Sequence, residues 1–83
     1  MNENRKAEAQ QALREFLARR ELAPGSRWRH YKGGLYEVVS VSIREDTLEP
    51  LVTYRSLERG FVWTRTLHKW SETVNGQPRF APE

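Results

Sequence analysis

The chain has 83 residues, a formal net charge of +3 and no cysteine. A chain of this length forms one domain with a small core, and the missing thiols exclude disulfides, thiolate metal sites and a cysteine nucleophile. No apolar run approaches the roughly 20 residues that cross a bilayer, and the first residues lead into no hydrophobic signal segment. We therefore expect a cytoplasmic protein with no membrane partner.

The N-terminal segment, residues 4–22, is rich in helix formers and ends at the stop signal Ala23-Pro24-Gly25. Its apolar residues recur at the spacing of three and four that lines one helical face: Ala9, Ala12, Leu13, Phe16 and Leu17. The pattern predicts an amphipathic helix and connector over residues 1–24, followed by a β-domain over residues 25–83. The apolar stripe either docks on the β core or pairs two copies of the chain.

After Gly25 the hydrophobic period changes to two, which indicates strands. The longest is expected over residues 35–43, with one face formed by Leu35, Val39, Val41 and Ile43 and the other by Tyr36, Val38, Ser40 and Ser42. Further strands are expected over residues 26–31, 50–55 and 61–65. Asn75-Gly76 is the strongest hairpin signal and is expected to join residues 71–74 to 77–80, after one helical turn at residues 67–70.

Consecutive short strands of this kind predict an antiparallel meander. A single flat sheet would expose an apolar face and two edges, so we expect it to curl. The predicted fold class is mainly β with one N-terminal α-helix, folded as a small, partly open SH3-like antiparallel β-barrel. An open antiparallel sheet with the helix packed on one face is the alternative.

A basic segment opens the longest strand. Arg29, His30 and Lys32 precede Gly33-Gly34, and a double glycine leaves backbone amides unshielded while the cations add charge-assisted hydrogen bonds. This combination predicts an anion cradle for phosphate or carboxylate. The pattern is equally compatible with a neutral, hydrogen-bonded His30 that holds the turn in place and binds no ligand.

Aromatic residues are interleaved with these cations: Tyr31, Tyr36, Tyr54 and Trp63. Such a surface could stack a nucleobase while its phosphate is neutralised, as in small barrels that bind single strands. Trp63 could instead belong to the core, and the charges could be solvated faces.

Other chemistry has less support in the sequence. His30 and His68 lie in different elements with no further ligand at metal spacing, so no metal and no cofactor is expected. No serine lies in a nucleophile elbow. A small enzyme that uses His30 as acid or base beside Glu37 or Glu49 remains an alternative.

Four blocks in this order resemble a known family: Arg29-His30-Tyr31-Lys32-Gly33-Gly34-Leu35-Tyr36, Asp46-Thr47-Leu48-Glu49-Pro50-Leu51-Val52-Thr53-Tyr54, Val62-Trp63-Thr64-Arg65 and Arg79-Phe80. The chain is similar, from Gly25 to Phe80, to the bacterial family filed as domain of unknown function 1653. The resemblance implies a characteristic set made of His30, Lys32, Gly33, Tyr36, Glu49, Tyr54, Trp63 and Arg65. It implies no catalytic residues. The chain departs from the family at Thr66, where relatives tend to have proline, and at Trp70, where phenylalanine is commoner.

Together these patterns predict a small non-enzymatic binding module for an anionic ligand, nucleic acid or a nucleotide. Its ligand-binding residues are expected to be Arg29, His30, Lys32, Gly33, Gly34, Tyr36, Glu49, Tyr54, Trp63 and Arg65. The alternative is a protein-protein interaction or homodimerisation module that pairs through its helix or a sheet edge.

Overall fold

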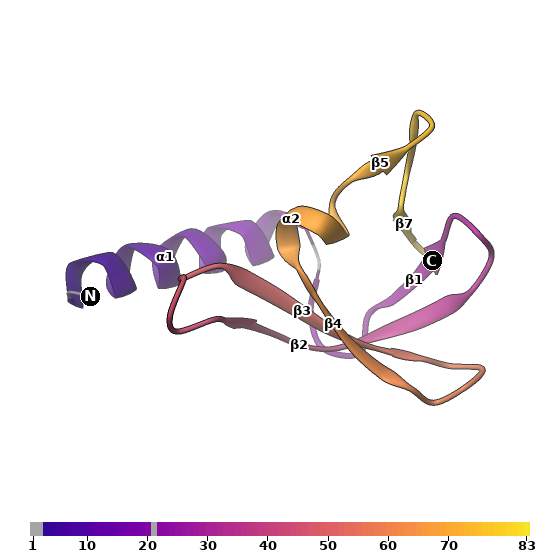
Figure 1. Ribbon diagram of the computed structural model, residues 1–83, viewed down its shortest axis with the longest axis horizontal. Coiled ribbons are helices and arrows are strands. Elements are labelled where there is room, and N and C mark those ends of the chain that lie inside the picture. The colour runs from indigo at the N-terminus through magenta and orange to yellow at the C-terminus, as the bar shows by residue number, and fades with distance from the viewer. Residues whose placement is uncertain (1–2, 21) are drawn as a thin grey trace.

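The computed structural model describes residues 3–20 and 22–83, and of residues 17–20 it describes the backbone alone. In chain order the elements are α1 (Glu3–Arg20), β1 (Arg27–His30), β2 (Leu35–Ile43), β3 (Pro50–Ser56), β4 (Val62–Thr66), α2 (Leu67–Trp70), β5 (Thr73–Val74), β6 (Gln77–Pro78) and β7 (Phe80–Pro82) (Figure 1). The predicted mainly β fold with one N-terminal helix is confirmed.

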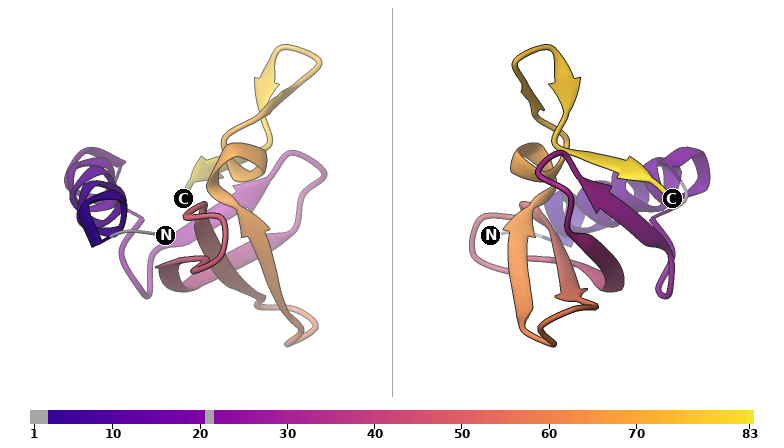
Figure 2. Two further views of the ribbon diagram at one scale, coloured as in Figure 1. Left: turned by 60° about the vertical axis from the view of Figure 1, so that its left-hand side comes forward. Right: turned by 90° about the vertical axis from the view of Figure 1, so that its right-hand side faces the viewer.

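Five strands form one antiparallel sheet in the order β4-β3-β2-β1-β7. The four strands from β1 to β4 follow the chain as a meander, and β7 returns to pair with β1. The sheet is not closed into a barrel, because β4 and β7 remain separate edges (Figure 2). The structure therefore confirms the predicted antiparallel sheet and its open form. The predicted likeness to an SH3 barrel stays a prediction.

The side chains of β2 are divided between the two faces in a way that strict alternation did not predict. The pairing of β2 with β3 shifts between Val38 and Ser40, which makes Val39 the extra residue of a β-bulge. Val38 is consequently buried and Val39 is 44% exposed. After the bulge, Val41 joins Tyr36 against the core. The predicted grouping of Val39 with Val41 is wrong because a bulge resets the face on which each later residue lies.

The core lies on one face of the sheet and is largely aromatic. Its buried residues are Leu22, Trp28, Val38, Val52, Tyr54, Trp70 and Phe80. The rings of Trp70 and Phe80 stack with their centroids 3.8 Å apart, and Trp28 meets Trp70 edge to face. Trp70 reaches this position because α2 folds back over β3 and β4. The predicted helical turn is confirmed, and its N-terminus is capped by Thr66 Oγ1, which accepts a hydrogen bond from Lys69 N.

Helix α1 lies along one side of the sheet, with its N-terminal half beside the β2–β3 turn (Figure 1). Phe16 packs against the core, which confirms docking for that residue. Ala9, Ala12 and Leu13 face Leu48 across a groove of about 310 Å³. The Leu17 side chain is outside what the structure describes. No helix in the described part of the chain is long and apolar enough to cross a membrane.

The C-terminal hairpin is shorter than predicted. Asn75 and Gly76 both have positive φ, as a tight two-residue hairpin turn requires, but only β5 and β6 pair across it. Phe80 leaves the hairpin and pairs with His30 in the main sheet. The chain diverts at Arg79, whose carbonyl accepts a hydrogen bond from Tyr31 N. Stacking of Phe80 on Trp70 accounts for the diversion, because burial of an aromatic ring outweighs two further ladder bonds at the surface.

Candidate functional site

Two turns lie at the same end of the sheet, the β1–β2 turn and the β3–β4 turn (right-hand end of Figure 1). Between them is a groove of about 610 Å³. A second hollow of about 280 Å³ continues it over the sheet face, because Tyr36 and Trp63 line both. We call the two together the aromatic groove. It is lined by His30, Lys32, Gly33, Gly34, Tyr36, Tyr54, Ser56, Glu58, Arg59, Phe61, Trp63, Arg65 and Phe80.

Trp63 is the most unusual residue of this groove. It is directly opposite Tyr54 on the neighbouring strand, yet it is 54% exposed. Phe61, with its ring centroid 6.2 Å from that of Trp63, is 62% exposed. Soluble domains leave few large aromatic rings in water side by side, and such pairs mark interaction sites more often than isolated rings do. The structure therefore argues against the interpretation of Trp63 as a core residue.

Tyr36 forms the floor between the two hollows. Its ring contacts the edges of Tyr54 and Phe80, so it is held by the core on one side. On the other side the ring approaches the β1–β2 turn, where a Cβ added at Gly34 would lie 3.0 Å from Tyr36 Cε2. Glycine at this position allows the turn to approach the ring closely.

His30 is the last residue of β1, and its ring packs where this strand enters the β1–β2 turn. Its Nδ1 accepts a hydrogen bond from Lys32 N, so the ring proton of the neutral form is on Nε2. Burial lowers the pKa of His30, and the positive charges of Arg79, Arg65 and Lys32 lower it further. The ring also contacts Phe80 edge to face. This geometry matches the interpretation of His30 as the residue that fixes the turn.

The turn itself engages part of the backbone that was predicted to form an anion cradle. Lys32 N donates to His30 Nδ1, and Gly33 N donates to the His30 carbonyl oxygen at 2.8 Å. The turn thus uses these two amides internally, because a tight turn satisfies its own donors before any ligand arrives.

Arg29 does not contribute a free cation either. It pairs with Glu83 at 2.8 Å and donates a second hydrogen bond to the Gly33 carbonyl oxygen. The hydrogen bond and charge of Glu83 raise the pKa of Arg29, and the same bond lowers the pKa of Glu83. Arg29 is also absent from the lining of the aromatic groove.

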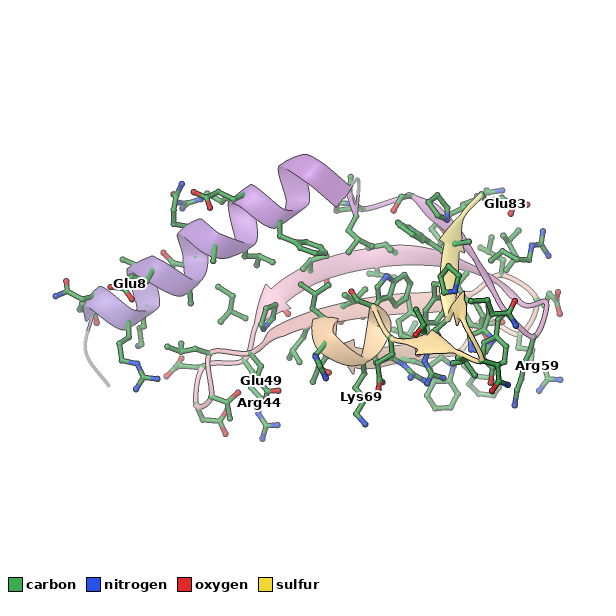
Figure 3. All side chains as sticks on the ribbon, turned by 90° about the horizontal axis from the view of Figure 1, so that it is seen from above. Glu8, Arg44, Glu49, Arg59, Lys69 and Glu83 are labelled. Atoms are coloured by element: carbon green, nitrogen blue, oxygen red, sulfur yellow. The ribbon has the colours of Figure 1, made fainter. Side chains whose placement is uncertain are left out.

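Glu49 lies far from the aromatic groove. It follows the β2–β3 turn, where its carbonyl oxygen accepts a hydrogen bond from Arg44 N. Figure 3 shows Glu49 and Arg44 at one end of the sheet and Arg59 at the other. The aromatic groove brings together the remaining members of the predicted set: His30, Lys32, Gly33, Gly34, Tyr36, Tyr54, Trp63 and Arg65.

The sequence analysis did not include Phe61 and Arg59 among the site residues. A signal for Phe61 was present, because residues two apart on a strand share a face, and Phe61 stands two before Trp63. Arg59 sits in the β3–β4 turn, and its place beside the β1–β2 turn depends on tertiary structure. The cations on the groove are Lys32, Arg59 and Arg65, against the single carboxylate of Glu58.

The acid-base pair proposed around His30 is not assembled. Glu37 makes a salt bridge with Arg55, and Glu49 is at the other end of the sheet (Figure 3). All charged groups that shift the pKa of His30 are cations. Within residues 3–20 and 22–83, no three His, Cys, Asp or Glu side chains are grouped as metal ligands would be.

Comparison with known proteins supports the resemblance seen in the sequence. Residues 26–82 match the family model described as protein of unknown function (DUF1653). The chain is 39% identical to a solved protein of that family from Bordetella bronchiseptica, with a TM-score of 0.60 over 71% of this chain and 83% of the other. No curated protein matches.

Proposed function

This chain belongs to the DUF1653 family of proteins of unknown function, and we propose that it is a non-enzymatic module that binds single-stranded nucleic acid in the aromatic groove. The observation that carries the proposal is the pair of exposed rings, Phe61 and Trp63, beside three cations. A nucleotide of a single strand binds well where its base can stack on a ring and its phosphate lies near a positive charge, and the groove offers both.

Stacking would take place on Trp63. The residue is fixed in β4 by pairing with β3, so its backbone is already ordered before a ligand arrives. Stacking of a base on an aromatic side chain contributes about 1–3 kcal/mol and tolerates any base, since every base has a π face. Phe61 would take a neighbouring base, because its ring lies within 6.2 Å of the Trp63 ring.

Phosphate contacts would come from the groove walls. Lys32 lies on the β1–β2 turn and Arg59 lies on the β3–β4 turn. A nucleic-acid strand bound in the groove would therefore pass between these two cations. Arg65 adds a third at the inner end, where it is oriented by a hydrogen bond from its Nε to Tyr54 Oη. Glu58 lies beside Arg59 in sequence and would exclude phosphate from its own side of the groove.

Fluorescence anisotropy with labelled twelve-residue oligomers of dT and rU tests the proposal. With about three phosphates neutralised, the affinity should fall about eighteenfold between roughly 50 and 200 mM salt. Trp63→Ala should weaken binding by about 5- to 150-fold, the equivalent of one lost stacking contact. Lys32→Ala should weaken binding. It should also reduce the slope of log affinity against log salt concentration by the contribution of one phosphate contact.

The matched control is Lys69→Ala, since Lys69 is an exposed lysine of α2 outside the groove (Figure 3). This variant should bind as the unmodified protein does. Inorganic polyphosphate serves as a second control because it carries charge without bases. Equal affinity for polyphosphate, together with unchanged oligomer binding in Trp63→Ala, would refute base stacking as the mode of recognition.

A further inference from the structure

The two edges of the main sheet differ in how they are protected. Edge strand β7 has three residues and contains Pro82, which has no amide proton to offer a further strand. Edge strand β4 has five residues and no proline, and its sequence is Val62-Trp63-Thr64-Arg65-Thr66. Its one charged side chain, Arg65, points onto the core face, where its Nε bonds to Tyr54 Oη. Apart from this one inward-facing charge, β4 lacks the short length, the proline and the bulge that protect other edges, so we expect it to have a pairing partner.

The backbone groups that β4 offers to a partner follow from its pairing with β3. Ser56 N donates to the Phe61 carbonyl oxygen, and the register then places ladder bonds on every second residue, at Trp63 and Arg65. Val62 and Thr64 therefore direct their amide and carbonyl groups away from β3. Nothing in the described part of the chain pairs with that side of β4.

We propose that β4 pairs antiparallel with β4 of a second copy of this chain, about a two-fold axis at Thr64. In this register Thr64 lies opposite Thr64 of the other copy, Trp63 opposite Arg65, and Val62 opposite Thr66. Each opposition is favourable: two hydroxyls, a cation beside a tryptophan ring and two β-branched side chains. A strand that complements itself at every position identifies a second copy as the occupant.

The rest of the fold leaves room for this contact. Helix α2 begins directly after β4 and packs over β3 and β4 with Trp70 in the core, and neither it nor any other described segment pairs with the outer backbone of β4. Val62, 56% exposed, and Phe61 extend the apolar surface available to the second copy. Because a five-residue edge buries less than a standard interface of about 1,600 Å², we expect dissociation in the micromolar range. A two-fold axis perpendicular to the sheet places the two aromatic grooves on the same face.

Sedimentation velocity over a concentration series, with a charge exchange at the axis, tests the pairing. Thr64→Lys and Thr64→Glu each bring like charges together across the axis and should weaken self-association about fivefold. An equal mixture of the two variants should associate at least as well as the unmodified chain. Thr73→Lys, at an exposed threonine outside the main sheet, is the control and should leave association unchanged.

Crosslinking provides a second measurement, because the chain has no native cysteine. Hydrogen-bonded cross-strand partners have Cα atoms about 5.5 Å apart, which suits a disulfide. Thr64→Cys should therefore oxidise to a covalent dimer faster than Thr73→Cys. A monomer at all concentrations, or no recovery when Thr64→Lys and Thr64→Glu are mixed, would overturn the proposal. Equal crosslinking rates for the two cysteine variants would overturn it too.

Discussion

Tyr54 and Trp63 lie directly opposite each other on neighbouring strands, yet Tyr54 is 6% exposed and Trp63 is 54% exposed. The difference arises from what covers each ring. Trp70 and Phe80 contact Tyr54, with ring centroids at 5.1 and 5.5 Å. The core ends at this point, and the same sheet face continues into the aromatic groove. One face of a small sheet thus serves first as a core and then as a surface open to a ligand.

Two tryptophans should therefore respond very differently to truncation. Trp70→Ala removes a ring that is 4% exposed and stacked on Phe80, so it should lower the free energy of unfolding by about 3–5 kcal/mol. Trp63→Ala should change it by less than about 1 kcal/mol. Urea denaturation followed by circular dichroism measures both. Equal losses would mean that Trp63 contributes to the core.

The bulge in β2 can be tested with two neighbouring valines. Val38→Thr places a hydroxyl among buried side chains and should cost about 1–3 kcal/mol. Val39→Thr places it in water and should cost close to nothing. Both variants replace valine with threonine, so the difference between their free energies of unfolding, measured by the same urea denaturation, reports only where the side chain lies. A larger cost at Val39 than at Val38 would contradict the register shift between Val38 and Ser40.

Arg29 should be dispensable for ligand binding. Its guanidinium is engaged by Glu83 and by the Gly33 carbonyl oxygen, away from the groove lining. We expect Arg29→Ala to bind the twelve-residue oligomers as tightly as the unmodified chain, whereas Lys32→Ala loses affinity. Both residues are cations of the same segment, so each serves as the other's control in the anisotropy assay. A loss of affinity in Arg29→Ala would show that Arg29 contributes to ligand binding.

The β1–β2 turn should make stability depend on pH. Because the pKa of His30 is lowered in the folded state, the unfolded state binds more protons once the pH falls below the ordinary value of 6.5. The contribution of His30 is therefore complete above pH 6.5, decreases as the pH falls below it, and is lost once the pH has passed below the folded pKa. His30→Asn keeps an acceptor for Lys32 N in the same local turn but does not titrate there.

Urea denaturation at several pH values on both sides of 6.5 measures this effect. The unmodified protein should lose more stability on acidification than His30→Asn. Parallel curves for the two proteins would show that His30 is not the titrating group.

Much of the fold could be predicted because its determinants are local. The helix stripe, the period of two and Asn75-Gly76 each act within a few residues. The bulge at Val39 could not be predicted, since it depends on how β2 fits β3. The same is true of Phe80, which pairs with His30 because Trp70 stacks on it.

The site was predicted in part for the same reason. Residues that share strands or turns, such as Lys32 and Tyr36, follow from the local pattern. Arg29 was misjudged because its partner, Glu83, is 54 residues away in sequence. Glu49 was included through the family resemblance alone, and the structure places it at the far end of the sheet (Figure 3).

The most direct test of the aromatic groove as a binding site is amide chemical-shift mapping during titration with a short dT or rU oligomer. The account predicts that perturbed amides are concentrated in residues 31–36, which are the β1–β2 turn and the start of β2, and in residues 58–65. Shifts confined to α1 or the β2–β3 turn, or no shifts at a concentration where anisotropy reports binding, would contradict it.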